Sequence, residues 1–224
     1  TDIDGMTEIL SIMGVKISRR SNEVFLQAKH LRHVELPYEL VHGLRASFFC
    51  IGALLGKQGK AKIPLPGGCQ IGARPIEEHL KGLKALGAEI QIKEGVIKAS
   101  IPGTIKRLKA ANIALNFPSV GATETLLMAT SLSDGLSTIK NAAKEPEIQD
   151  LARMLNSMGA KIKGAGTHTI TIEGVKKLNG CIHKAIPDRI EAGTFLIAAA
   201  ITRSSVLVGP IIIDHLTSVL SMLK

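Results

Sequence analysis

A cysteine and an arginine lie five residues apart in the segment PLPGGCQIGARPIEEHL, residues 64–80. Two glycines precede Cys69, and Arg74 comes directly before a proline, a residue favoured at the first position of a helix. A free thiol titrates with a pKa of about 8.5, which a nearby cation or helix N-terminus lowers. Cys69 can therefore exchange a proton near neutral pH, on a loop that the glycines keep mobile. An isolated cysteine is more often a small buried residue in a turn, and the residues alone leave both interpretations open.

The other cysteines and the histidines predict no second reactive site. Cys50, Cys69 and Cys181 are an odd number at wide spacing, which argues against a disulfide framework and against a paired-cysteine metal site. We expect Cys50 to be packed within an apolar helix and Cys181 to follow a turn. The seven histidines form no convincing metal set, and HLRH at 30–33 is typical of a solvated face. The pattern favours a reducing compartment.

Charge and composition favour small phosphorylated ligands. The 28 basic and 19 acidic residues give a net charge of +9, which suits anionic partners. With no Trp, one Tyr and five Phe, the chain has few stacking platforms for single-stranded nucleic acid, and no basic run is dense enough to follow a phosphate backbone. No stretch approaches the roughly 18 apolar residues that a membrane span needs. We therefore expect neither nucleic acid nor a membrane as a partner.

An internal repeat must position the cysteine loop. The segments TEILSIMGVKI, HLKGLKALGAEI and LARMLNSMGAKI share apolar residues at helical spacing that end at Gly14, Gly87 and Gly159, at intervals of 73 and 72 residues. Each predicts an amphipathic helix with a left-handed glycine at its end and a β-strand directly after it. Paired strand patterns follow, such as AEIQIKE with GVIKASI and AKIKGAG with HTITIEGV.

A second recurring element is apolar on all sides. The segments RASFFCIGALLG, GATETLLMATSL and AGTFLIAAAIT contain Ser47, Thr123 and Thr194, which are 76 and 71 residues apart. A helix that is apolar all round must be buried all round. We therefore predict an α/β protein built from repeated α-β-β units of about 72 residues, whose central helices are enclosed by sheets and other helices.

Five sequence blocks resemble the UDP-N-acetylglucosamine 1-carboxyvinyltransferases, the enolpyruvyl transferases of peptidoglycan synthesis. They are LRAS at 44–47, LPGGCQIGARPIEEH at 65–79, FPSVGATET at 117–125, NAAKEPEI at 141–148 and PDRIEAGTF at 187–195. The resemblance runs through nearly the whole chain and implies an inside-out α/β barrel with two lobes of three repeated units. By it, residues 1–187 are an incomplete first lobe that carries the cysteine loop, and residues 188–224 are the truncated start of the second.

The resemblance also implies a reaction. The family transfers the enolpyruvyl group of phosphoenolpyruvate to the 3-hydroxyl of UDP-N-acetylglucosamine, through a tetrahedral intermediate and with release of phosphate. It needs no cofactor, and both substrates are polyanions, in agreement with the basic charge balance. Cys69 matches the family's loop cysteine, which acts at the phosphoenolpyruvate carbon as proton donor and as the site of a covalent adduct, and which fosfomycin modifies. Closure of the loop would exclude water from the intermediate.

Further positions match the family's substrate contacts. The resemblance implies a substrate-binding set of Arg45, Arg74, Pro75, Ile76, Glu77, Glu78, Phe117, Pro118, Ser119 and Val120. The family usually has Asp where this chain has Glu77, and the segment from Phe117 is expected along the uridine and diphosphate. Asp188, Arg189 and Glu191 fall at the predicted join between the lobes.

Taken by themselves, several of these residues also fit structural roles. Arg45 can cap or snorkel from the end of its apolar helix, and Ser119 can be the N-cap of the next helix. The cap and phosphate binding are compatible, because free N–H groups at a helix start bind anions. The charged residues between 188 and 191 can equally form a salt-bridged hinge.

Three features of the family have no counterpart in these 224 residues. A Lys-Asn-Ala motif is expected upstream, and an aspartate base and another phosphoenolpyruvate-binding arginine are expected downstream, so we expect an incomplete and inactive part of a longer enzyme. A non-catalytic descendant that binds a ligand or a partner is one alternative. A shikimate enolpyruvyl transferase is another, against which the cysteine loop and the FPSVGATET block speak. The expected location is the bacterial cytoplasm or a plastid stroma, and the sequence predicts no oligomeric state.

Overall fold

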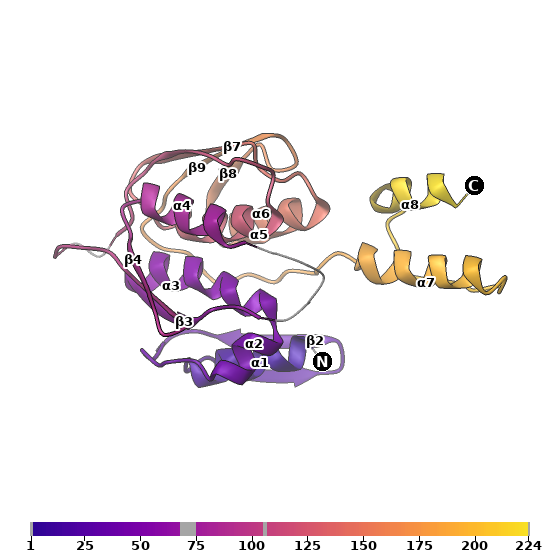
Figure 1. The fold of residues 1–224 in the computed structure, drawn as a ribbon, viewed down its shortest axis with the longest axis horizontal. Helices are drawn as coiled ribbons and strands as arrows, with labels where there is room; N and C mark the ends of the chain where they lie inside the picture. Colours follow the sequence, from indigo (N-terminus) through magenta and orange to yellow (C-terminus); the bar gives the residue numbers. More distant parts are fainter. Residues whose placement is uncertain (1, 68–74, 105–106, 224) are drawn as a thin grey trace. The chain divides into compact units, whose positions relative to one another are not determined.

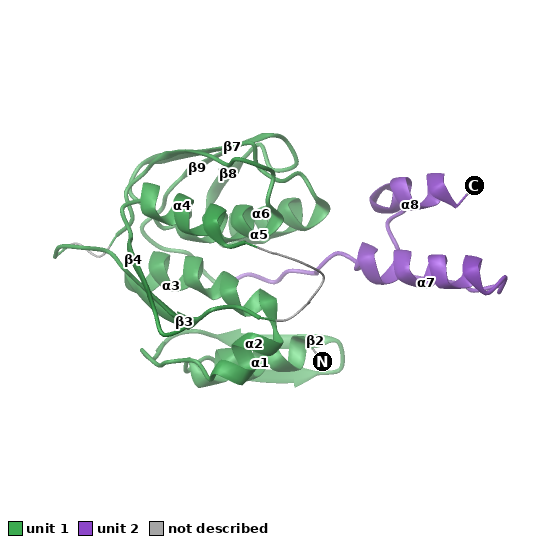
Figure 2. Cartoon of the chain, in the orientation of Figure 1, with its two compact units in different colours: residues 1–180 green, residues 181–224 purple. Residues whose placement is uncertain are grey.

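The computed structural model describes residues 2–67, 75–104 and 107–223. The predicted reactive Cys69 and the predicted ligand Arg74 lie outside these described residues. The chain divides into two compact units, residues 1–180 and residues 181–224, which Figure 2 shows in green and purple. The predicted lobe boundary at residue 187 stays a prediction. In the described part of the chain, no helix has the length and apolar character needed to cross a membrane.

The first unit holds helices and three small sheets (Figure 1). Its elements are α1 (Asp2–Ile12), β1 (Lys16–Arg20), β2 (Glu23–Gln27), α2 (Tyr38–Gly43), the 3-10 helix η1 (Arg45–Phe49), α3 (Cys50–Gln58), β3 (Lys60–Pro64), α4 (Glu77–Ala85), β4 (Glu89–Lys93), β5 (Val96–Ser100), β6 (Asn112–Ala114), α5 (Val120–Thr130), β7 (Leu136–Lys140), α6 (Pro146–Ser157), β8 (Lys161–Lys163) and β9 (Thr169–Glu173). The strand orders are β1-β2, β3-β5-β4 and β6-β7-β9-β8, with β6 and β7 parallel and the other pairs antiparallel.

The repeat predicted from the three glycines is confirmed at atomic detail. Gly14, Gly87 and Gly159 have φ angles of 89°, 87° and 100°, a left-handed conformation that glycine adopts without strain. After each glycine, a backbone N–H donates to a carbonyl five residues earlier, which is the bond of a Schellman helix end. The three bonds are Val15 to Leu10 (3.0 Å), Ala88 to Leu83 (3.1 Å) and Ala160 to Leu155 (2.9 Å).

The two apolar helices α3 and α5 form the centre of the first unit. α5 packs against α3, α4 and α6 and also against strands β7 and β9, so it is enclosed by helices and sheet together, as an inside-out α/β arrangement requires. Glycines allow the closest approaches: a Cβ on Gly52 would lie 2.2 Å from the Thr125 carbonyl oxygen, and one on Gly82 would lie 2.5 Å from the Leu126 side chain. The predicted burial is confirmed: Phe48 of η1, Ile51 and Leu55 of α3, and Leu126 and Leu127 of α5 are at most 1% exposed.

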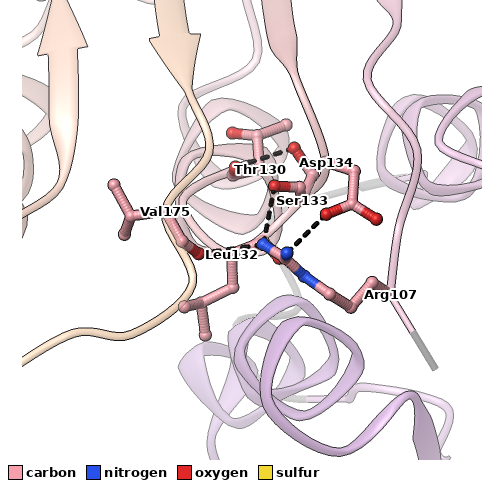
Figure 3. Close-up of polar contacts among 6 residues, drawn as sticks. All are labelled: Arg107, Thr130, Leu132, Ser133, Asp134 and Val175. Carbon is pink, nitrogen blue, oxygen red and sulfur yellow. Dashed lines mark hydrogen bonds and ion pairs between the residues drawn. The ribbon is translucent and has the colours of Figure 1, made fainter. Parts of the chain in front are cut away.

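Arg107 ties two loops of the first unit together (Figure 3). Its Nε and Nη2 donate to the Leu132 carbonyl at 3.2 and 3.1 Å, and Nη2 also donates to the carbonyls of Ser133 and Val175, both at 3.0 Å. Nη1 forms an ion pair with Asp134. One side chain thereby satisfies carbonyls of the turn after α5 and of the segment that leaves β9, where helical and ladder bonds have ended.

The second unit contains α7 (Arg189–Ile201), the 3-10 helix η2 (Ile213–Leu216) and α8 (Thr217–Met222). α7 is apolar on all sides, and the sequence predicts that it is enclosed. That expectation is wrong for the structure described: the residues of α7 that are buried are Ala192 and Gly193, while Phe195 and Ile201 are 55% and 77% exposed. Within its unit, α7 lies against the short helices η2 and α8 near Gly193, and these two helices cover one side of it.

Candidate functional site

The described candidate residues of the first unit lie at the starts of three helices. Arg45 is the first residue of η1, Glu77 and Glu78 begin α4, and Ser119 is the N-cap of α5. The three helices meet at α5, which contacts both α4 and η1. Segments more than 70 residues apart in sequence are thereby brought to one region.

Four residues form what we call the helix-end cluster: Arg45, Phe49, His79 and Gly121. The rings of Phe49 and His79 are stacked, with centroids 6.4 Å apart and planes 15° apart. A Cβ on Gly121 would lie 2.9 Å from Phe49 Cε1 and 3.1 Å from His79 Cε1. Glycine is thus the residue that lets the start of α5 approach the two rings.

His79 is neutral at physiological pH. Burial, and to a smaller extent the positive charge of Arg45, together lower its pKa to about 4. The ring is 4% exposed, and Nδ1 lies 3.0 Å from Thr125 Oγ1, a hydrogen bond whose direction depends on the tautomer. The neutral ring joins η1, α4 and α5 without adding a second positive charge beside Arg45.

A buried carboxylate fixes the segment that precedes α5. Both oxygens of Glu78 accept hydrogen bonds from Asn116, one from its backbone N–H and one from its side-chain Nδ2, each at 2.7 Å. Lys81 Nζ donates to Asn116 Oδ1 and to the Ala114 carbonyl, both at 2.8 Å. Glu78 is 4% exposed, so its carboxylate is occupied by these bonds within the protein. These bonds link the start of α4 to the segment that precedes α5.

At the N-terminus of α5, one backbone N–H group is capped by a side chain and two others have no partner within the helix. Ser119 Oγ accepts from the Ala122 N–H at 3.3 Å, which confirms the cap role considered for this residue. The first N–H groups of a helix have no intrahelical partner, so those of Val120 and Gly121 are available to an anion. One turn further, Thr123 Oγ1 donates to the Ser119 carbonyl (2.8 Å) and accepts from the Ala143 N–H (3.1 Å), which holds the NAAKEPEI segment against α5.

An acidic group lies beside this helix start. Burial, and to a smaller extent the negative charges of Glu147 and Glu145, together raise the pKa of Glu124 to about 7. Glu124 therefore exchanges a proton near neutral pH, on the same helix that offers N–H groups at its start.

The remaining predicted residues of the first unit are at the surface or half-buried. Phe117 is 47% exposed, Pro75, Glu77 and Pro118 are exposed, and Ile76 and Val120 are half-buried. These side chains are free to meet a ligand, whereas Glu78 is not.

In the second unit, Asp188 is the N-cap of α7. Its Oδ1 accepts from the N–H groups of Ile190 at 2.7 Å and Glu191 at 3.1 Å. Glu191 lies in the first turn of the helix, where a negative charge is favourable. The interlobe role of Asp188, Arg189 and Glu191 stays a prediction.

Several residues of the site were not found from the sequence. His79 lies inside the block LPGGCQIGARPIEEH but carries no spacing signal of its own, and Lys81 reads as an ordinary surface lysine. Asn116 had one usable sign: it is polar and directly follows the alternating strand pattern NIAL. Its pairing with Glu78 spans 38 residues and could not be read locally.

Comparison with known proteins identifies the family. The family model for EPSP synthase (3-phosphoshikimate 1-carboxyvinyltransferase) matches residues 1–224. The chain belongs to the EPSP synthase family. The fold of the solved members agrees: the enolpyruvyl transferase NikO from Streptomyces tendae has a TM-score of 0.73 at 25% identity, covering 88% of this chain and 46% of that one. An EPSP synthase from Acinetobacter baumannii has a TM-score of 0.64 at 23% identity, covering 88% and 44%.

Two curated relatives are more similar to this chain in sequence than these two solved structures. A UDP-N-acetylglucosamine 1-carboxyvinyltransferase of Prochlorococcus marinus (strain MIT 9313) is 63% identical over 224 residues, which are 100% of this chain and 52% of that protein. The protein of the same name from Synechococcus sp. (strain CC9605) is 58% identical over 225 residues, 100% of this chain and 52% of that protein. The chain thus spans about half the length of the curated relatives it matches.

Proposed function

We propose that this chain is part of an enzyme that transfers the enolpyruvyl group of phosphoenolpyruvate to the 3-hydroxyl of UDP-N-acetylglucosamine, a step of peptidoglycan precursor synthesis. The observation that carries the proposal is the 63% identity over all 224 residues to a protein named for this reaction. The helix-end cluster supports it, because a cation beside the open N-terminus of α5 suits a diphosphate. We infer a cytoplasmic or plastid-stroma location for the reaction.

In this proposal, the residues of the first unit bind the nucleotide sugar. Arg45 and Arg74 contact its negative charges, Ser119 and Val120 offer the open end of α5 to the diphosphate, and Phe117 faces the nucleobase. Glu78 acts through Asn116 as a positioning residue, since its carboxylate is already satisfied. The exposed Glu77 remains the carboxylate of this turn that can reach the sugar.

Cys69 supplies the chemistry in this proposal. The sugar 3-hydroxyl gives its proton to the aspartate base that the resemblance implies and adds through its oxygen to C2 of phosphoenolpyruvate, while Cys69 donates a proton to the methylene carbon. The methyl group of the tetrahedral intermediate then loses a proton to a base as phosphate leaves and the double bond forms again. In the same proposal, Asp188, Arg189 and Glu191 act close to the substrates. No cofactor enters any step.

Two other functions compete with this one. A shikimate enolpyruvyl transferase is less favoured, because the relatives named for the sugar-nucleotide reaction are 58–63% identical whereas the EPSP synthase of known structure is 23% identical. A non-catalytic descendant that only binds a ligand or partner makes a different prediction for substrate binding, which calorimetry can test.

Calorimetry with the 224-residue chain is the direct test of the binding half. We expect saturable heat with UDP-N-acetylglucosamine and no phosphate release from phosphoenolpyruvate. Arg74→Ala and Arg45→Ala should each weaken binding by about 1.5–3 kcal/mol if they make charge-assisted hydrogen bonds. Glu78→Gln should weaken it less, because it loosens the segment 116–120 without removing a ligand contact. Lys177→Ala, at an exposed position of the first unit, is the matched control for lost charge.

The outcomes separate the alternatives. No heat from any ligand with a chain shown by circular dichroism to be folded would favour the non-catalytic descendant. Measurable phosphate release would show that the essential chemistry lies within these 224 residues. Tighter binding of shikimate 3-phosphate than of UDP-N-acetylglucosamine would favour the sister reaction.

Brief alkylation tests the proposed role of Cys69. Cys50 is buried, as the sequence predicts, and burial raises the pKa of its thiol to about 11, so it holds almost no thiolate near neutral pH. We expect iodoacetamide to label Cys69 first and Cys50 last, with the half-buried Cys181 between them. Mass spectrometry of tryptic peptides measures the order. Faster labelling of Cys181 or Cys50 than of Cys69 would contradict the assignment of the reactive thiol.

A further inference from the structure

The two copies of the repeat that contain Gly14 and Gly87 differ in how the chain pairs at a sheet edge. In both, the segment that returns from a strand pair is anchored by the same bond to the end of a helix: Arg32 N–H donates to the Met13 carbonyl (2.8 Å), and Lys109 N–H donates to the Leu86 carbonyl (2.9 Å). After Lys109, the chain pairs as β6 in parallel with β7. After Arg32, residues 33–37 form no ladder with another strand in the described part of the chain, and β3 is the edge strand of its sheet there.

This difference opens a cavity of about 480 Å³ between residues 32–36 and the edge of β3. The volume lies in the range of small-molecule sites, roughly 300–1,000 Å³. Its floor is apolar, formed by the buried side chains of Met13, Leu36, Leu54, Ala61 and Ala99.

The outer wall of the cavity is held at both ends. Gln58 Nε2 donates to the Leu31 carbonyl at 3.3 Å beside the Arg32 anchor. At the other end, the ammonium group of Lys62 forms an ion pair with Glu35. The cavity is therefore bounded by fixed segments on both sides.

The rim of the cavity is strongly basic. It carries Arg32, His33, Lys60, Lys62 and Lys98 against one carboxylate, Glu35. Lys62 and Lys98 are direct cross-strand partners, an arrangement that like charges destabilise. Glu35 neutralises Lys62, and among the described residues Arg32, Lys60 and Lys98 have no ion-pair partner. An anion in the cavity would relieve this repulsion.

We propose that this cavity binds a small organic phosphate, a dianionic phosphate carried on an apolar body. The phosphate contacts Lys60, Lys98 and Arg32, and the apolar body lies on the floor between Met13 and Leu54. This site is distinct from the helix-end cluster: Gln58 is the last residue of α3, whereas Arg45 begins η1, the helix before it, and the nine residues of α3 alone span roughly 13 Å.

The test uses 1-naphthyl phosphate as the probe with the isotope-labelled 224-residue chain. We expect saturable amide shifts at residues 60–62 and 98–99 in a nitrogen-proton correlation spectrum. Inorganic phosphate and 1-naphthol, each lacking half of the probe, should bind at least about tenfold more weakly. Lys98→Glu should weaken the probe by about tenfold or more, because it replaces a contact with a repulsion.

Control variants separate this site from the nucleotide-sugar site. Lys177→Glu makes the same change of net charge at a distant exposed lysine and should leave the probe's affinity unchanged. Arg45→Ala should also leave it unchanged, and Lys98→Glu should leave UDP-N-acetylglucosamine binding unchanged. Circular dichroism and a thermal melt of each variant show that it is folded.

Three results would overturn the proposal. One is the absence of saturable shifts at residues 60–62 and 98–99, which would leave the lysines with the role of protecting an edge strand from pairing. Another is equal weakening by Lys177→Glu and Lys98→Glu, which would reduce the effect to overall charge. The third is binding of inorganic phosphate as tight as that of the probe, which would remove the apolar body from the ligand.

Discussion

The helices α5 and α7 have the same kind of sequence and opposite environments. Both are apolar on all sides and both carry a threonine in the first turn or directly after it, Thr123 in α5 and Thr194 in α7. Thr123 is 0% exposed within a shell of helices and strands, whereas Thr194 is exposed in its unit. An apolar helix sequence thus favours burial, but whether the helix is buried depends on which other elements pack against it. Three pairs of matched substitutions can break or sharpen this comparison.

The largest difference is expected at the glycines of the two helix contacts. Gly52→Ala should lower the free energy of unfolding by about 3 kcal/mol, because the new Cβ would lie 2.2 Å from the Thr125 carbonyl oxygen, a backbone atom that cannot yield. In α7, a Cβ on Gly193 would meet Val219 Cγ2 at 3.5 Å, an ordinary contact. Gly193→Ala should be neutral or stabilising by about 0.5–1 kcal/mol through helix propensity.

Chemical denaturation of both variants measures this pair. A Gly52→Ala protein as stable as the wild type would mean that α3 and α5 are not packed at the distance described. A loss of several kcal/mol for Gly193→Ala would instead show that α7 is tightly packed in solution.

The two threonines provide a second, smaller contrast. Thr123→Val removes the acceptor of the Ala143 N–H, a buried donor, and should cost about 1–3 kcal/mol. Thr194→Val removes a bond from the hydroxyl to the Ile190 carbonyl at an exposed position and should change stability by less than about 0.5 kcal/mol. Thermal melts of the pair give the ranking. Equal costs would remove the difference in environment that separates the helices.

The smallest effect is expected in the pH dependence of stability. The pKa of Glu124 is raised from 4.5 to about 7 in the folded chain, so its contribution to stability is fully present below about pH 4.5 and is lost as pH rises through 7. Glu124→Gln should flatten stability across this window and exceed the wild type at pH 8 by about 1 kcal/mol. Glu191→Gln in α7, an exposed carboxylate, is the control.

Urea denaturation between pH 4.5 and 8 provides the measurement. A Glu124→Gln profile parallel to that of the wild type would show that Glu124 is not held in a buried, acidic setting. A flattened profile for Glu191→Gln as well would assign the pH dependence to charge in general, and the contrast between α5 and α7 would be lost.

Local features were readable because their causes are local. The glycine ends of α1, α4 and α6 follow from a bond between residues five apart and from a backbone conformation that glycine favours, so the three copies could be located from sequence spacing alone. The paired strands were found for the same reason, since their alternation is a property of adjacent residues. The family blocks led to the helix starts at Arg45, Glu77 and Ser119.

The interpretation of single side chains was less complete. Glu78 belongs to the substrate segment by resemblance, yet its carboxylate is taken up by Asn116, which no local pattern connects to it. A histidine in a helix carries no sign of whether it is buried, so the sequence predicts no role for His79. Its lowered pKa depends on burial and on Arg45, both supplied by elements elsewhere in the chain.

The sequence by itself determined the repeat, the helix ends, the strand pairs and the two kinds of helix, because these depend on periodicity and on the conformations that single residues allow. The tertiary structure alone decided which apolar helix is enclosed, which carboxylate is occupied and which sheet edge stays open beside residues 32–36. Those outcomes depend on contacts between segments tens of residues apart, which are so close that a Cβ added at Gly52 or Gly121 would collide with the neighbouring segment.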